Sequence, residues 1–159
     1  MDLFYDVGVM KSLLCIIFFV LLTIVSISDL YQMKIPNQLC VAILILGIIS
    51  IFFIKEISIL DRFLGAVVIS IPMLVVAMIT KRSFGGGDIK LMAATGVFLG
   101  AELIIVGAVL GLLMTGIYII ISYITKNHGI KSGLALGPCF SIGMIISCML
   151  GGQIWNLIF

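Results

Sequence analysis

Residues 91–125 read LMAATGVFLGAELIIVGAVLGLLMTGIYIIISYIT, and Glu102 is the one charged residue among them. As a single α-helix this stretch would be about 50 Å long, whereas the hydrocarbon core of a bilayer is about 30 Å thick. The helix must therefore break, and Gly100-Ala101-Glu102 is the expected place. We expect a short apolar segment before the break and a full membrane span after it.

The rest of the chain has the same character. Of its 159 residues, 63% are hydrophobic and 10% are charged, and the mean hydropathy is +1.41. A soluble domain carries about a quarter charged residues. Apolar runs at about residues 9–28, 39–54, 63–80 and 134–150 supply four more spans, and Pro72 is expected to kink the third. The sequence thus predicts an all-α polytopic membrane protein with about six transmembrane helices, forming a single domain over residues 1–159 and surrounded by lipid.

The positive charges of the loops favour one orientation. With six spans and the N-terminus outside, six Lys and Arg residues fall on the inner side and three on the outer side, as the positive-inside rule prefers. If the short fourth segment did not span, the split would be four to five. The inner cations are Lys34, Lys81, Arg82, Lys90, Lys126 and Lys131; the outer ones are Lys11, Lys55 and Arg62.

The acidic residues divide differently. Only Asp29 and Asp88 fall on the inner side, and the other five acids, Asp2, Asp6, Glu56, Asp61 and Glu102, fall on the outer side. Ionisable groups at a membrane boundary are costly, so both inner acids are functional candidates. Each also has a structural interpretation, because Asp29 could pair with Lys34, and Asp88 could be a helix N-cap with Lys90 as its partner.

Two carboxyl groups held close together cannot both ionise easily, so one tends to keep a proton. The ionised partner can then take a proton from water while the protonated one polarises a peptide carbonyl. This is aspartic peptide hydrolysis, which needs no metal and no cofactor. Gly85-Gly86-Gly87 precede Asp88 and would let the backbone adopt unusual dihedral angles and approach an extended substrate, although a glycine triplet is also typical of a flexible loop.

A family resemblance rests on these residues. Gly85-Gly86-Gly87-Asp88, followed by Ile89-Lys90, resembles the G-x-G-D motif of the intramembrane aspartyl proteases in its type IV prepilin peptidase form. Asp29-Leu30 followed by Ile35-Pro36-Asn37 is similar to that family's first aspartate site, and Ala135-Leu136-Gly137-Pro138 more weakly resembles its final glycine-proline segment.

The resemblance implies a membrane aspartic endopeptidase that removes the leader from pilin-like or pseudopilin precursors at the cytoplasmic face of the cell membrane. Asp29 and Asp88 would be the catalytic acids, with Gly85, Gly86 and Gly87 forming the active-site loop. Lys90, Pro36, Asn37, Gly137 and Pro138 would have supporting roles. Many members also carry a soluble zinc domain and methylate the new N-terminus; this chain resembles the short, peptidase-only members, so no methyltransferase activity is expected.

Other partners and protein classes fit less well. The net charge of +2 and the lack of a basic run argue against nucleic acid, and the four cysteines form no C-x-x-C pair, so no metal site is predicted. A presenilin-like protease would have a Tyr-Asp pair where Ser28-Asp29 stands. An ion-coupled carrier could use both acids to bind its ion, and a non-catalytic assembly subunit would need neither. The sequence specifies no oligomeric state.

Overall fold

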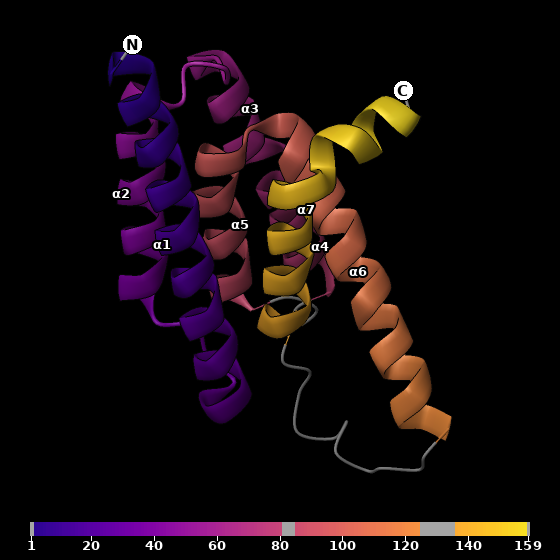
Figure 1. Ribbon diagram of the computed structural model, residues 1–159. Coiled ribbons are helices and arrows are strands. Elements are labelled where there is room, and N and C mark those ends of the chain that lie inside the picture. Colours follow the sequence, from indigo (N-terminus) through magenta and orange to yellow (C-terminus); the bar gives the residue numbers. More distant parts are fainter. Residues whose placement is uncertain (1, 81–84, 125–135, 159) are drawn as a thin grey trace.

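The computed structural model describes residues 2–80, 85–124 and 136–158, which are almost entirely helical (Figure 1). No β-strand occurs in these three ranges. The helices are α1 (Asp2–Gln32), α2 (Asn37–Phe53), α3 (Ile59–Val68), α4 (Ser70–Thr80), α5 (Gly86–Leu99), α6 (Ala101–Ile124) and α7 (Gly137–Ile158).

Four helical stretches are long and apolar enough to cross a bilayer: Gly8–Gln32, Ile59–Thr80, Ala101–Ile121 and Gly137–Asn156. The protein is therefore an all-α polytopic membrane protein, as predicted. Helix α2 has 17 residues and α5 has 14, so they are about 26 Å and 21 Å long. The count of six spans and the outer N-terminus stay predictions. Four of the loop cations behind that orientation, Lys81, Arg82, Lys126 and Lys131, lie outside the described residues.

Successive passes of the chain run in opposite directions, counting α3 and α4 as one pass (Figure 1). As a result, the end of α1, the start of α5 and the start of α7 lie at the same end of the bundle, opposite both termini. Helix α1 continues to Gln32, beyond the predicted end at residue 28, so Asp29 lies in its last turn. This topology brings together three segments that are far apart in sequence.

The predicted break between residues 91 and 125 is confirmed. Helix α5 ends at Leu99 and α6 begins at Ala101, with Gly100 between them at φ +81°. An L-residue rarely adopts this angle, and a Cβ at Gly100 would collide with the carboxylate of Asp61. The same carboxylate accepts the Ala101 N–H at 3.3 Å and so satisfies a free donor at the start of α6.

The interruption of the third pass also follows from the sequence. Helix α3 ends at Val68 and α4 begins at Ser70. Pro72 has no N–H to donate to the Val68 carbonyl, and its ring crowds that group, so the helix breaks one turn before the proline. The Met73 N–H then bonds the Ile69 carbonyl at 3.1 Å and restores the helical pattern.

Small residues set the closest helix contacts around α5. Gly65 of α3 and Gly96 of α5 face each other so closely that a Cβ on either would collide with the other's backbone. Without a hydrophobic driving force in lipid, such close backbone packing is a main source of helix association. On the other side of α5, Phe98 stacks on Phe18 of α1 with ring centroids 4.3 Å apart. Helix α5 therefore packs against α3 through Gly96 and against α1 through Phe98.

Arg62 does not behave as the loop cation that the sequence suggested. Its side chain is 2% exposed and donates to Ser50 Oγ at 2.7 Å, to the Ile54 carbonyl at 2.9 Å and to the Val97 carbonyl at 2.9 Å. The two carbonyls lie at the C-terminal ends of α2 and α5, where the last carbonyls lack helical partners and attract positive charge. Arg62 therefore holds these two helix ends together.

Candidate active site

Asp29 is fixed by a contact with the last helix. Its carboxylate Oδ2 accepts the backbone N–H of Gly137, the first residue of α7, at 2.8 Å, and the residue is 6% exposed. A Cβ on Gly137 would lie 2.7 Å from this oxygen, so only glycine allows the approach. Pro138 follows in the first turn, where a missing N–H costs nothing. The positive end of α7 favours a negative charge on Asp29.

Asp88 has a different environment, in the first turn of α5. It is 9% exposed, and its Oδ2 accepts the Gly85 N–H at 3.2 Å. Gly85 is the N-cap residue and Asp88 is the third helical residue, so the prediction that Asp88 itself could be the N-cap is wrong by three positions. Its second oxygen, Oδ1, is buried and has no hydrogen-bond partner among the described residues.

The two acids line one cavity of about 230 Å³. Its walls come from the α1–α2 connector and from the start of α5, and the remaining lining residues are Met33, Lys34, Ile35, Gly85, Gly86 and Gly87. In the described part of the chain, neither acid forms an ion pair; the salt bridge found there joins Lys11 and Glu56. The two ion pairs that the sequence offered as structural alternatives, Asp29 with Lys34 and Asp88 with Lys90, are therefore not formed among the described residues.

Burial and the neighbouring Asp29 carboxylate raise the pKa of Asp88 from 3.8 to about 6, against the opposing effect of the Gly85 hydrogen bond. Asp88 precedes the apolar segment that begins at Leu91, so it lies at the polar end of α5. An acid that shares a cavity with a second acid and lacks a partner for one oxygen is suited to keep its proton near neutral pH. The cavity can therefore hold one protonated and one ionised carboxyl group.

The glycines before Asp88 contribute differently from what the sequence suggested. Gly85 has ordinary extended dihedral angles, φ −68° and ψ 143°, and Gly86 and Gly87 already belong to α5. What matters is close packing: a Cβ on Gly87 would lie 3.0 Å from the Ile35 Cβ, and one on Gly85 would lie 3.0 Å from Asp88 Oδ2. Gly87 therefore lets the α1–α2 connector lie directly against the start of α5, and Gly85 leaves room for the Asp88 carboxylate.

Pro36, Asn37 and Lys90 join the same two segments. Pro36 is the N-cap residue of α2, with φ −61° and ψ 132°, and Asn37 is the first helical residue. The ammonium group of Lys90 donates to Asn37 Oδ1 at 3.0 Å. Lys90 thus bonds the first residue of α2 rather than either acid, and this contact links the start of α2 to the first turns of α5.

Sequence reasoning missed part of the lining. Met33 ends α1 with a left-handed φ of 49°, and its N–H bonds the Asp29 carbonyl at 2.8 Å. Methionine gives no signal for this conformation, which glycine or asparagine usually adopts. The importance of Gly137 was also understated, because its contact with Asp29 joins residues 108 positions apart. Ala135, the first residue of the glycine-proline segment that contains Gly137, lies outside the described residues.

Fold and cavity together define a polytopic membrane protein with a pair of buried carboxyl groups at one end of its helical bundle. The sequence profile described as the Type IV leader peptidase family matches residues 16–120. This match covers most of the chain, including both acids. The chain belongs to the Type IV leader peptidase family.

Two curated relatives are similar over most of this chain. A "Prepilin leader peptidase/N-methyltransferase" of Bacillus subtilis (strain 168) is 31% identical over 143 residues, covering 87% of this chain and 56% of the relative. A protein of the same name from Pectobacterium carotovorum subsp. carotovorum is 29% identical over 140 residues, covering 82% and 49%. The chain therefore spans about half the length of these relatives. No solved structure matches it.

Proposed function

We propose that this protein is an aspartic endopeptidase that removes the leader from pilin-like precursors at the cytoplasmic face of the cytoplasmic membrane. The observation that carries the proposal is the cavity shared by Asp29 and Asp88, in which neither acid forms an ion pair with a described residue. Family membership supports the substrate class, since both relatives are named prepilin leader peptidases.

The two environments suggest a division of roles. Asp29, at the positive end of α7 and bonded to the Gly137 N–H, is the ionised base. Asp88, with its raised pKa and an Oδ1 that accepts no hydrogen bond from the described residues, is the protonated acid. This arrangement is the one in which a carboxylate pair activates water without a metal or a covalent intermediate.

The reaction then proceeds in two steps. Asp29 takes a proton from a bound water as the water oxygen attacks the scissile carbonyl carbon, while Asp88 donates its proton to the carbonyl oxygen. In the second step the tetrahedral intermediate collapses, the C–N bond breaks, and the proton held by Asp29 passes to the leaving amine. Asp88 regains its proton from the intermediate's hydroxyl group, so both acids return to their starting states.

The site's position suits a precursor anchored in the same bilayer. The cavity lies at the polar end of α5 and at the end of α1. We expect this level to be the membrane boundary, where water and a membrane-inserted substrate meet. A cut at this level separates a polar leader from the apolar helix that follows it. The relatives' names also include N-methyltransferase. For this chain we predict cleavage without N-methylation, and the mass of the released product would test this.

Co-expression with a pilin-like precursor tests the proposal. We expect the wild-type chain to shorten the precursor, and Asp29→Asn and Asp88→Asn to leave it uncut while still accumulating in the membrane. Asparagine keeps the shape of aspartate but can neither accept the proton from water nor share one across the pair. Cleavage by either variant at the wild-type rate would remove the carboxylate pair from the mechanism, and no cleavage by the wild type would favour a carrier or assembly role.

A further inference from the structure

Two cysteines that the proposed mechanism does not use lie against each other. Cys15 of α1 and Cys148 of α7 are free and partly buried, and the Cys148 thiol donates a hydrogen bond to the Cys15 sulfur. The two residues are far apart in the sequence and form no C-x-x-C motif, so no sequence pattern predicted this contact. Two thiols in direct contact on different helices are placed to form a cross-link between those helices.

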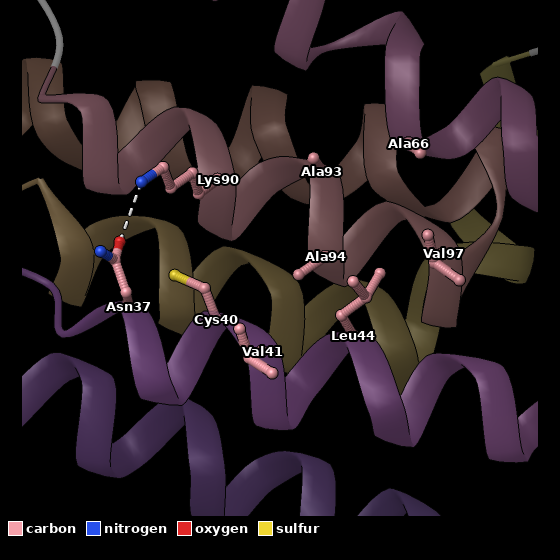
Figure 2. Close-up of a pocket in the computed structure, with 9 residues that line it drawn as sticks. All are labelled: Asn37, Cys40, Val41, Leu44, Ala66, Lys90, Ala93, Ala94 and Val97. Carbon is pink, nitrogen blue, oxygen red and sulfur yellow. Dashed lines mark hydrogen bonds between the residues drawn. The ribbon is translucent and has the colours of Figure 1, made fainter.

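The two remaining cysteines are not part of this pair. Cys40 lies between α2 and α5, beside the hydrogen bond between Lys90 and Asn37 (Figure 2), and donates its thiol hydrogen to the Gly87 carbonyl. Cys139 is partly buried in the first turn of α7, about 14 Å along that helix from the pair. Both are therefore thiols of the same chain that can serve as internal controls.

Helical spacing brings the paired cysteines to facing sides, independently of their hydrogen bond. Helices α1 and α7 run in opposite directions (Figure 1), and the bond between the Gly137 N–H and Asp29 joins them at one end. Cys15 lies fourteen residues before Asp29, which is nearly four turns, and Cys148 lies eleven residues after Gly137, which is about three turns. Each cysteine therefore returns to the face on which its helix makes the Asp29–Gly137 contact.

Neighbouring contacts hold both helices at the level of the pair. One turn from Cys15, the Phe18 ring stacks on an α5 ring with centroids 4.3 Å apart. Next to Cys148, the Ser147 hydroxyl donates to a backbone carbonyl of α6. These contacts fix the rotation of α1 and of α7, so bond formation requires only that the two sulfur atoms move from hydrogen-bonding contact to covalent distance.

The pair lies far from the acids along the bundle. The fourteen residues from Cys15 to Asp29 span about 21 Å of helix, against a hydrocarbon core about 30 Å thick. With Asp29 at the inner boundary of the membrane, as we predict, the pair lies in the outer half of the bilayer. Disulfides persist on that side of the membrane, where the reducing systems of the cytosol do not act.

We propose that Cys15 and Cys148 form a reversible disulfide that braces α1 against α7. The oxidant is dioxygen, which is apolar and dissolves in the bilayer. Two pairs of thiols lose four electrons and four protons as two S–S bonds form, and one dioxygen molecule takes them up to give two water molecules. A small dithiol reverses the reaction by exchange and is itself oxidised to a disulfide. The brace holds together the two helices that carry Asp29 and Gly137.

Counting thiols by mass spectrometry tests the proposal on the purified full chain in vesicles. The protein is treated with copper phenanthroline in air, denatured and alkylated. We expect the wild type to keep two of its four thiols and to regain all four after dithiothreitol. Cys15→Ser and Cys148→Ser should each keep all three remaining thiols, whereas Cys139→Ser, the matched control, should keep one of three. Four alkylated thiols in the treated wild type, or a disulfide-linked dimer in place of the internal bond, would overturn the proposal.

Thermal unfolding in detergent tests whether the bond acts as a brace. A cross-link that closes a long loop stabilises a fold, so the oxidised wild type should have a Tm at least about 5 °C above the reduced wild type. Cys15→Ser should have the same Tm in both conditions. An internal disulfide that leaves the wild-type Tm unchanged would overturn the brace. Neither measurement uses a precursor, so these outcomes are independent of the proposed peptidase activity.

Discussion

The backbone N–H of Gly137 donates to Asp29 Oδ2 at 2.8 Å and so joins the last turn of α1 to the first residue of α7. This bond places a buried carboxylate at the positive end of a helix, where negative charge is stabilised. Among the described residues, none donates a hydrogen bond to Asp88 Oδ1. The two acids of one cavity are therefore unequal, and the predictions below follow from that inequality.

Gly137→Ala is expected to lower the cleavage rate at least about tenfold, because the new Cβ would lie 2.7 Å from Asp29 Oδ2 and displace the carboxylate. Gly152→Ala, in the same helix but with no neighbouring atom within 4 Å of its added Cβ, is the matched control. Cleavage of the precursor by both purified variants is the measurement. Equal rates for Gly137→Ala and Gly152→Ala would mean that the Asp29–Gly137 contact is not needed for activity.

The cleavage rate is expected to fall as the pH rises above about 6. Asp88 must be protonated to donate to the carbonyl oxygen, and its pKa is raised to about 6 by burial and by Asp29. Each further pH unit should therefore reduce the protonated fraction by up to about tenfold. Initial rates in reconstituted vesicles between about pH 5 and 8 check this. A rate that rises steadily over this range would contradict the role of Asp88 as the acid.

Asp88→Asn is expected to stabilise the fold at neutral pH while abolishing cleavage. The folded-state pKa of Asp88 lies above its ordinary value of 3.8, so folding takes up a proton between about pH 4 and 6, and stability falls as pH rises through that window. Removing the charge should recover about 1–3 kcal/mol above pH 6 and little below pH 4.

Thermal unfolding in detergent at about pH 7.5 and pH 4 measures this difference. Asparagine keeps an oxygen that can accept the Gly85 N–H, so the N-terminal contact of α5 is retained. A lower Tm for Asp88→Asn than for the wild type at neutral pH would contradict the electrostatic cost that we assign to Asp88.

Arg62→Met is expected to destabilise the protein by about 2–4 kcal/mol, because part-buried carbonyls at the ends of α2 and α5 lose their charged donor. Lys55→Met removes a cation from an exposed position nearby and should have an effect within about 0.5 kcal/mol. The two Tm values in detergent test the difference. A similar small shift for both would show that Arg62 is not needed to hold the helix ends.

The sequence predicted features that depend on local properties. The length and composition of residues 91–125 required a break, and the break lies at Gly100 because its φ of +81° suits glycine. The inner acids Asp29 and Asp88 stood out by charge and motif, and they do line one cavity. Their catalytic roles stay predictions.

Features that depend on packing between distant segments could not be predicted in the same way. Arg62 was interpreted as a loop cation because its carbonyl partners, Ile54 and Val97, belong to two helices whose ends meet only in the fold. The glycines before Asp88 were expected to adopt unusual dihedral angles, whereas Gly87 is needed for its approach to Ile35. In both cases the reason is a tertiary contact that no sequence pattern specifies.

The measurement that tests the central claim most directly is a double-mutant cycle on cleavage in reconstituted vesicles, comparing wild type, Asp29→Asn, Asp88→Asn and the double variant. Two acids that act as one catalytic unit are grossly non-additive. We predict that each single variant loses at least about a thousandfold in rate and that the double variant is no slower than either. A single variant with the wild-type rate, or losses that multiply in the double variant, would contradict the account.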